Sequence, residues 1–256
     1  MNFVKTFNDC RPAKGQVALF WFGQAGFMFK TAGGRAVAID PYFTDYVLHA
    51  EKLAGFKRLS PPPCEPDDIV LDYLLISHEH GDHFDQEAIR TLMANGRTQV
   101  YTNPVCAARM REMGLDMNRV HVCRKGERIA LDEFELLGVD CDHGVLAPEA
   151  LGFILDFGFT RVYYAGDTAP TWERLSVPME IKPEVAILPI NGAYGNLDGA
   201  QAADYAGRLG CRICVPCHFW TFPLHHGDPQ QILDAIGESA PDCELRLLCQ
   251  GEGFLL

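Results

Sequence analysis

The stretch that decides the fold is Tyr73-Leu74-Leu75-Ile76-Ser77-His78-Glu79-His80-Gly81-Asp82-His83, an apolar strand that runs directly into a polar turn. Residues i and i+2 on extended backbone project to the same side, so His78 and His80 can bind one metal ion. Asp82 and His83, on the turn that follows, can reach a second ion. A surface loop that is rich in histidine by chance is the alternative. Three imidazoles and a carboxylate directly after a buried strand favour the metal site.

Three further apolar strands are also followed by side chains that can bind a metal. A rigid sheet can bring such distant ligands together at one edge. Taken singly, a histidine is compatible with a capped or partly buried side chain, and an aspartate with a turn or a helix N-cap. A two-metal site, however, requires a bridging carboxylate. The strands and their candidate ligands are Phe134 to Val139 with His143, Arg161 to Tyr164 with Asp167, and Ile213 to Val215 with His218.

The composition is that of a folded protein. The chain has 256 residues, of which 48% are hydrophobic and 22% charged, and this excludes disordered and collagen-like classes. A net charge of -12 disfavours nucleic acid or an anionic membrane as the main partner. We find no export signal and no membrane-spanning run, so we expect a cytoplasmic protein whose ten cysteines are thiols. These features are compatible with a homo-oligomer.

Short apolar runs rich in β-branched and aromatic residues predict many strands with fewer helices between them. Residues 42–68 lose periodicity and contain a proline run, which predicts a long surface connection. We find no fixed-period repeat and no flexible linker, and therefore expect a single α/β domain over residues 1–256. Besides the strands above, we expect strands at 17–22, 26–30, 35–39, 70–76, 100–102, 151–157 and 185–188, others near 120 and 129, and helices at 86–94, 104–113 and 199–209.

The order and spacing of these candidate ligands resemble those of the metallo-β-lactamase superfamily, from about residue 17 to the C-terminus. The resemblance implies a four-layer αββα sandwich of two mixed sheets with helices outside and a dinuclear site at one edge. All seven ligand positions carry the expected residue types. By this resemblance, His78, His80 and His143 hold the first metal, Asp82, His83 and His218 hold the second, and Asp167 bridges them.

Other segments resemble the ascorbate-6-phosphate lactonase branch of that superfamily. The glutamate found at the second ligand position in the di-iron electron-transfer branch is absent, because His80 stands there, and this disfavours oxygen reduction. The segments that carry the lactonase resemblance are Trp21 to Phe27, Ile39 to Tyr42, the prolines before residue 73, Leu188 to Gly192, Asn196 to Asp198, Pro216 to Trp220 and Gly227 to Pro229.

We expect a metal-dependent hydrolase in which two divalent ions, zinc or manganese with iron also compatible, lower the pKa of a shared water. The metal-bridged hydroxide would attack a small anionic ester or lactone, such as a phosphorylated sugar-acid lactone like that of ascorbate 6-phosphate. Asp82 would shuttle the proton to the leaving group. The alternatives are a phosphodiesterase that acts on a small substrate and a non-catalytic metal or metabolite sensor.

Five further residues are candidates for supporting roles. Asp40, fixed by Pro41 at a strand end, could orient a ligand histidine. An ordinary turn residue is an equally weighted alternative. His225 and His226 could meet an anionic substrate, although solvated loop histidines are common. Asn191 could donate a hydrogen bond at the rim of the site, or merely form a turn. Arg58 could bind a phosphate.

The spacing Cys211-x-x-Cys214-x-x-Cys217 is compatible with a zinc or iron–sulfur site. No matching set of cysteines lies nearby in the sequence. Residues 213–215 are also predicted to form a core strand, in which cysteine packs as a small apolar side chain. We therefore favour core thiols.

Overall fold

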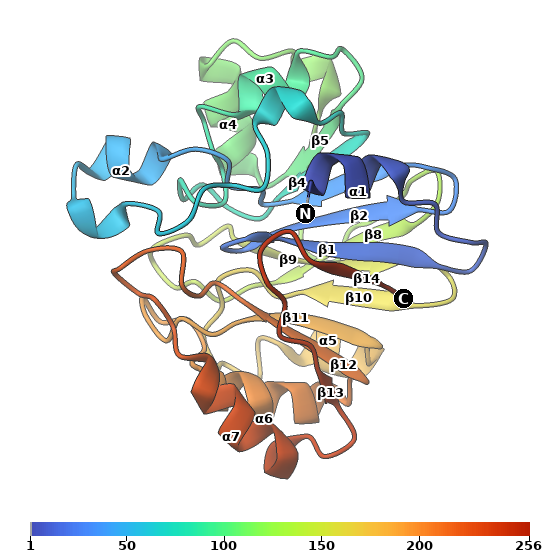
Figure 1. Cartoon of the computed structure of the whole chain (residues 1–256), viewed down its shortest axis with the longest axis vertical. Helices are drawn as coiled ribbons and strands as arrows, with labels where there is room; N and C mark the ends of the chain where they lie inside the picture. Colours follow the sequence, from blue (N-terminus) through green and yellow to red (C-terminus); the bar gives the residue numbers. More distant parts are fainter. Residues whose placement is uncertain (1) are drawn as a thin grey trace. The chain divides into compact units, whose positions relative to one another are not determined.

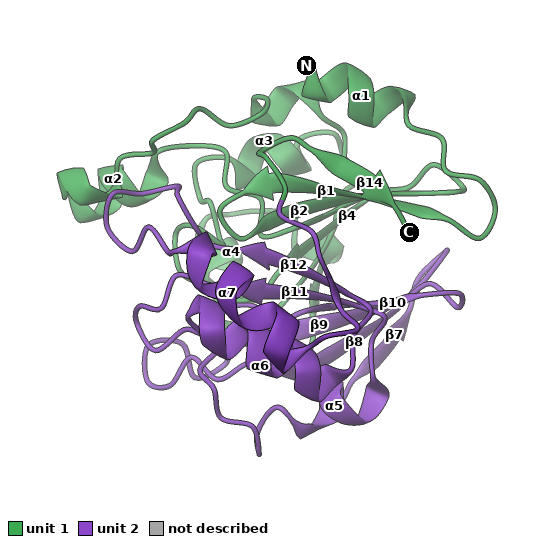
Figure 2. Cartoon of the chain, turned by 60° about the horizontal axis from the view of Figure 1, so that its bottom comes forward, with its two compact units in different colours: residues 1–123, 248–256 green, residues 124–247 purple. Residues whose placement is uncertain are grey.

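The computed structural model describes residues 2–256 and divides the chain into two compact units, shown in Figure 2. The first unit comprises residues 1–123 and 248–256, and the second comprises residues 124–247. Each unit contains one seven-stranded mixed sheet, and each sheet is accompanied by helices (Figure 1). No helix within residues 2–256 is long and apolar enough to cross a membrane. The single domain expected from the sequence stays a prediction.

The sheet of the first unit begins as an antiparallel meander and continues as parallel strands. The turn Gln24-Ala25 joins its first two strands, and Gln24 adopts a φ of 51° there. The strand order is β14 (Gly253–Leu255), β1 (Val17–Gly23), β2 (Gly26–Thr31), β3 (Ala36–Ile39), β4 (Tyr73–Ile76), β5 (Gln99–Thr102), β6 (Val120–Val122).

The core of the first unit joins its sheet to its helices. Phe3 of α1 packs edge-on against Phe20, with ring centroids 6.0 Å apart, while Cys106 and Met110 of α4 are fully buried in the same cluster. The Asn103 side chain caps α4 by accepting a hydrogen bond from the Cys106 N–H at 2.8 Å. The helices are α1 (Phe3–Asp9), α2 (Tyr46–Glu51), α3 (Ile89–Met93) and α4 (Pro104–Glu112), with 3₁₀ turns η1 (Ala54–Phe56), η2 (Pro66–Asp68) and η3 (Met117–Arg119).

In the second unit, α6 (Gly199–Leu209) contacts the parallel strand β11 (Val185–Pro189), and α7 (Pro229–Ser239) packs against α6. A capping box between Asp198 and Gln201 begins α6, and Gly210 ends it with a φ of 63°. The two helices pack so closely that a Cβ on Gly207 would lie 2.1 Å from the Ser239 carbonyl oxygen. In sheet order the elements are β7 (Arg128–Ala130), β8 (Glu135–Asp140), β9 (Leu151–Asp156), β10 (Arg161–Tyr164), β11 (Val185–Pro189), β12 (Ile213–Cys217) and β13 (Glu244–Leu245), with helices α5 (Ser176–Ile181), α6 (Gly199–Leu209) and α7 (Pro229–Ser239).

The two sheets have the same strand pattern although the sequence shows no repeat. In each, three antiparallel pairs are followed by three parallel pairs. The strand at which the pairing changes is β3 in the first unit and β10 in the second. An aspartate follows each of them closely, Asp40 after β3 and Asp167 after β10. The two carboxylates therefore occupy matching topological positions.

Most predicted elements are confirmed, with corrections at their ends. The strand expected from residue 70 begins at Tyr73, and Val70 is 50% exposed. The helix expected at residues 86–94 is shorter, because only Ile89–Met93 is helical. The connection at residues 42–68 contains α2 and two 3₁₀ turns. Four helices were not predicted: α1, α2, α5 and α7.

One buried carboxylate makes the stability of the first unit depend on pH. Burial raises the pKa of Asp72, but a hydrogen bond from the Ala36 N–H at 2.9 Å and the guanidinium groups of Arg97 and Arg35 lower it below its ordinary value overall. The stabilisation is therefore present above about pH 3.8 and is lost as the pH falls through the lower folded pKa. We expect Asp72→Asn to cost about 1–2 kcal/mol in urea unfolding at pH 7. The difference should shrink below pH 4, whereas exposed Asp67→Asn should change little at either pH.

Candidate metal site

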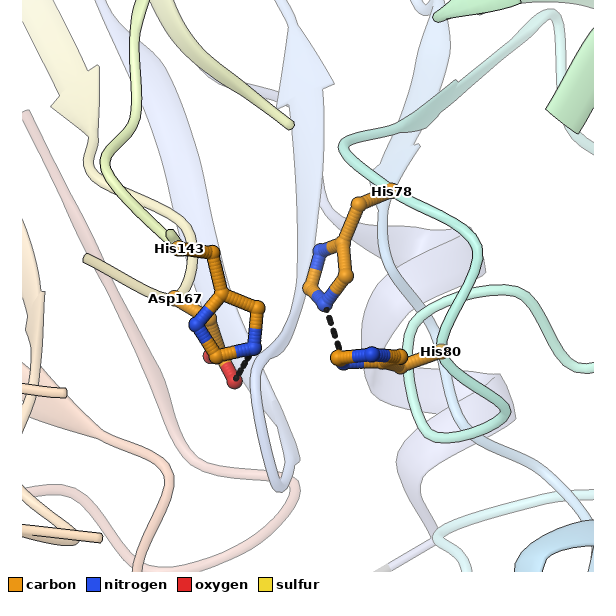
Figure 3. Close-up of side chains that lie close together, drawn as sticks. All are labelled: His78, His80, His143 and Asp167. Atoms are coloured by element: carbon orange, nitrogen blue, oxygen red, sulfur yellow. Dashed lines mark hydrogen bonds and ion pairs between the residues drawn. The ribbon is translucent and has the colours of Figure 1, made fainter. Parts of the chain in front are cut away.

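The first group of candidate ligands lies on the loop that follows β4. His78 is fully buried, and its Nε2 lies 3.0 Å from Nδ1 of the half-buried His80, as Figure 3 shows. On the other side of its ring, His78 Nδ1 lies 2.9 Å from the Ser77 hydroxyl. This contact fixes the ring and leaves Nε2 as the atom directed toward His80.

Asp40, directly after β3, contacts His83 and also Ser77, the residue before His78. Its Oδ2 lies 2.7 Å from Nδ1 of His83, and its Oδ1 accepts a hydrogen bond from the Ser77 N–H at 2.8 Å. Potential ligand atoms of Asp40, His78 and His83 all lie within 4.8 Å of one another, and all three side chains are buried. The structure thus places Asp40 where it can orient His83, so that Nε2 of His83 is the atom left for a metal.

Asp82 is held by Gln24, which lies within the segment Trp21 to Phe27 and was not predicted as a site residue. The Gln24 side-chain amide donates a hydrogen bond to Asp82 Oδ2 at 2.9 Å across 58 positions of sequence. Gln24 is itself buried, and its backbone carbonyl oxygen accepts a hydrogen bond from the Trp21 indole N–H at 3.0 Å. The turn between β1 and β2 therefore positions the carboxylate for which we predict a catalytic role.

The second group of candidate ligands lies within the second unit and centres on Asp167. One carboxylate oxygen of Asp167 lies 3.8 Å from His143 Nε2 (Figure 3), and the other lies 3.3 Å from His218 Nε2. All three side chains are buried. The two oxygens of one carboxylate thus face two different imidazoles.

Buried hydrogen bonds connect the loops that carry His143 and Asp167. The Cys141 thiol donates to the Asp167 carbonyl oxygen at 3.0 Å, and the Ala169 N–H donates to the Asp142 carbonyl oxygen at 2.8 Å. Burial raises the pKa of Asp142, but the Thr171 hydroxyl, the Gly144 N–H and the Arg174 guanidinium lower it overall. The charged Asp142 side chain thus holds the loop through its contacts with Thr171 and Arg174, and it was not predicted from the sequence as a supporting residue.

Backbone strain is concentrated around these ligands. Eight non-glycine residues among those described have positive φ, a conformation that costs about 1–3 kcal/mol and persists only where the surroundings enforce it. Six of the eight are candidate site residues or their close neighbours in the chain or in space. They are Gln24, Asp40, Tyr194, His218, Trp220 and His225.

The other predicted residues differ in their surroundings. Asn191 is buried just after β11; its Oδ1 accepts a hydrogen bond from Asn196 at 3.0 Å, while its Nδ2 has no partner among residues 2–256. The His225 ring lies 4.1 Å from the ring of Tyr194. His226 is exposed, and its carbonyl oxygen accepts a hydrogen bond from the Trp220 N–H at 2.6 Å.

The Arg58 side chain makes its contacts within the fold. Its guanidinium lies over the Tyr42 ring at 4.8 Å and donates hydrogen bonds to the carbonyl oxygens of Tyr42 and Ser60, at 2.6 and 3.2 Å. The residue is only 8% exposed. These contacts occupy guanidinium N–H groups that would otherwise bind a phosphate. We therefore leave Arg58 out of the proposed substrate site.

The spacing of Cys211, Cys214 and Cys217 does not produce a cluster. Cys214 and Cys217 are buried in β12, and no group of three or more potential metal ligands in the described part of the chain includes a cysteine. All ten cysteines are thiols. The strand predicted at residues 213–215 is confirmed, and it extends to Cys217.

The donor set fits a divalent transition metal. Imidazole nitrogens suit zinc and iron, and carboxylate oxygens also suit manganese. Each unit contributes buried imidazoles together with a buried aspartate, and the hydrogen bonds on the far side of the rings are those that orient metal ligands. The residues present are therefore compatible with the metals that the sequence predicts.

Comparison with known proteins identifies relatives over nearly the whole chain. A family model described as the beta-lactamase superfamily domain matches residues 18–218. A "UPF0173 metal-dependent hydrolase" of Rubrobacter xylanophilus is 29% identical over 248 residues, which cover 93% of this chain and 96% of that protein. A protein of the same description from Hyperthermus butylicus is 27% identical and covers 91% of this chain and 96% of its own length.

Solved structures show the same fold. A metallo hydrolase of the archaeon Ignicoccus hospitalis matches with a TM-score of 0.72 at 24% identity, covering 94% of this chain and 98% of that one. An isothiocyanate hydrolase from Delia radicum gut bacteria matches with a TM-score of 0.75 at 20% identity, covering 93% and 98%. The predicted α/β fold, with two mixed sheets flanked by helices, is thereby confirmed.

Proposed function

This chain belongs to the metallo-β-lactamase superfamily, and we propose that this metal-dependent hydrolase cleaves a small anionic ester or lactone, such as the lactone of ascorbate 6-phosphate. The observation that carries the proposal is the Asp167 carboxylate, whose two oxygens face His143 and His218 separately. A carboxylate in this arrangement supports a two-metal site, which suits hydrolysis. The lactonase-like segments described above support the choice of substrate.

We propose that the two groups of ligands complete one dinuclear centre. Each group alone is short of the ligands that two catalytic metals need, since a single catalytic zinc already takes three protein ligands. The family model spans residues 18–218 and so includes both groups. We assign His78, His80 and His143 to one metal, Asp82, His83 and His218 to the other, and Asp167 to both.

The chain's own side chains would bind the substrate and move the proton. Metal ions bound at this site would lower the pKa of water, so that hydroxide is available near neutral pH. Asp82, held by Gln24, would take up a proton and return it to the leaving group. The buried Nδ2 of Asn191 can donate a hydrogen bond to a substrate oxygen, and His225 and His226 can meet its anionic part.

A hydrolysis screen tests the proposal. The protein, purified without chelator, is assayed with lactones, thioesters and small phosphodiesters in the presence of Mn²⁺ or Zn²⁺, and its metal content is measured in parallel. Turnover of an anionic lactone or ester supports the proposal, and turnover of phosphodiesters alone favours the alternative enzyme. Tight metabolite binding without turnover of any substrate favours a sensor. A protein that binds well under one metal per chain even when metal is added would contradict all three.

The position of Asp40 predicts a loss of metal affinity. We expect Asp40→Asn to weaken metal binding by about 10–100-fold, the usual effect of removing the group that orients a ligand imidazole. The isosteric side chain preserves the volume but removes the charge that faces His83 Nδ1 at 2.7 Å. Competition with a fluorescent chelator measures the affinity. Exposed Asp67→Asn is the control, and an Asp40→Asn protein with wild-type affinity would remove this role.

A further inference from the structure

Two thiols lie close together near the start of β12, whereas the proposed metal ligand His218 follows the end of that strand. Cys211 precedes β12 and Cys243 precedes β13, and these strands pair in parallel with Ile213 opposite Glu244. The two Sγ atoms are 3.6 Å apart, although the residues are separated by 32 positions of sequence. His218 follows the other end of β12, so this pair lies outside the proposed hydrolase site.

The pair is accessible from one side. Cys211 is only 4% exposed, whereas Cys243 is partly exposed. Both line a cavity of about 340 Å³ at the C-terminal ends of α6 and α7, together with Gly207, Gly210 and Arg212. This volume is at the lower end of the range for small-molecule pockets. The cavity therefore admits a small reagent that reaches Cys243 first.

The environment assigns different roles to the two sulfurs. A hydrogen bond between the two thiols lowers the pKa of Cys243 below its ordinary value. The same hydrogen bond, together with burial, raises the pKa of Cys211. Cys243 is the more exposed of the two sulfurs and faces the cavity, and the thiolate is the attacking form, so Cys243 is the nucleophile and Cys211 the resolving thiol.

We propose that Cys211 and Cys243 form a thiol–disulfide exchange site for a low-molecular-weight disulfide. The Cys243 thiolate attacks one sulfur of the small disulfide, a mixed disulfide forms, and the other half leaves as a thiolate. Cys211 then attacks Cys243 Sγ, its proton passes to solvent, and the second half leaves. One small disulfide is reduced to two thiols while the protein gains one disulfide and loses two hydrogen atoms. No third cysteine among the described residues is near enough to form a metal-binding group with this pair.

Glutathione disulfide is the probe that tests this site. The native wild-type protein is incubated with it, quenched in acid, alkylated in denaturant and mapped by mass spectrometry. We expect a peptide that links Cys211 to Cys243 and a chain lighter by two hydrogen atoms, reversed by dithiothreitol. The Cys211→Ser protein should retain one glutathionyl group on Cys243. The Cys243→Ser protein should leave Cys211 unmodified.

Cys249 is the matched control because it is exposed and lies on the other unit. Cys249→Ser should leave the cross-link unchanged. The proposal is overturned if the wild-type protein carries glutathione on Cys249 while Cys211 and Cys243 are both recovered alkylated, or if the cross-link joins other cysteines. Hydrolase activity of Cys211→Ser is measured alongside and should match that of the wild type, so failure here is distinguishable from failure of the proposed hydrolase function.

Discussion

Replacing Asp82 with asparagine should lower kcat by about 10²–10⁴-fold, the usual contribution of a positioned proton-transfer group. Asparagine keeps the shape of the side chain and an oxygen that can accept the Gln24 hydrogen bond, but it cannot take up the proton. Steady-state kinetics on the substrate identified by the screen give kcat, and elemental analysis of the same samples gives the metal content. Because Asp82 is also a proposed metal ligand, metal is added until its content matches that of the wild type before kcat is compared.

The control for this experiment is Glu79→Gln. Glu79 is a half-buried carboxylate of the same loop whose Oε2 accepts a hydrogen bond from Asn103 at 3.3 Å, and it is outside the proposed ligand set. Its substitution should leave kcat within a few-fold of the wild type. Wild-type turnover by a metal-loaded Asp82→Asn protein would remove the proton-transfer role. A loss of metal without a change in kcat per bound metal would leave Asp82 as a ligand only.

The local parts of the fold could be predicted because the residues that determine them are neighbours in the sequence. The buried run before His78 indicates a strand whose end carries the ligands, and the structure begins that strand at Tyr73. The helix at 199–209 was predicted with its observed limits, since Asp198 caps its start and Gly210 ends it. Helix α7 has a comparable signal, with Asp228 as its N-cap and Pro229 at its first position, and it could have been found.

Other features depend on contacts between distant residues and leave no local pattern. β14 pairs with β1 from the far end of the sequence, at Ala18 and Leu255. The hydrogen bond from Gln24 to Asp82 spans 58 positions, so the turn between β1 and β2 gave no sign of its role. The shared strand pattern of the two units is also hidden, because it is a property of pairing and not of residue spacing.

The predicted supporting residues also differ in whether a local pattern in the sequence indicates their role. Asp40 was a sound candidate because a carboxylate fixed by proline at a strand end faces neighbouring strand ends, and the structure brings it 2.7 Å from His83. Arg58 was a weak candidate because an arginine in a loop has no local signal that distinguishes a ligand contact from an internal one. Its carbonyl partners and the Tyr42 ring became visible only in the folded chain.

Replacing Asp167 with alanine should remove at least one metal ion per chain and lower turnover by more than about 100-fold, the loss that an outer-shell partner alone can cause. The substitution removes the two carboxylate oxygens that face His143 and His218 and leaves two buried imidazoles without their charged neighbour. Metal titration followed by elemental analysis measures the stoichiometry, and kinetics are recorded on the same samples. Asp234→Ala, on the exposed face of α7, is the control.

The same variant tests whether the two groups of ligands act as one centre. If His78 and Asp167 bind the same pair of metals, the double variant His78→Ala/Asp167→Ala should be little worse than the more damaged single variant, because either change alone disrupts the shared centre. Two independent metal sites would instead lower turnover by two separate factors, so that the double variant would lose the product of the two. His49→Ala, with its side chain 57% exposed, controls for the loss of an imidazole. Losses that multiply in this way would contradict the dinuclear centre and leave each unit with a metal site of its own.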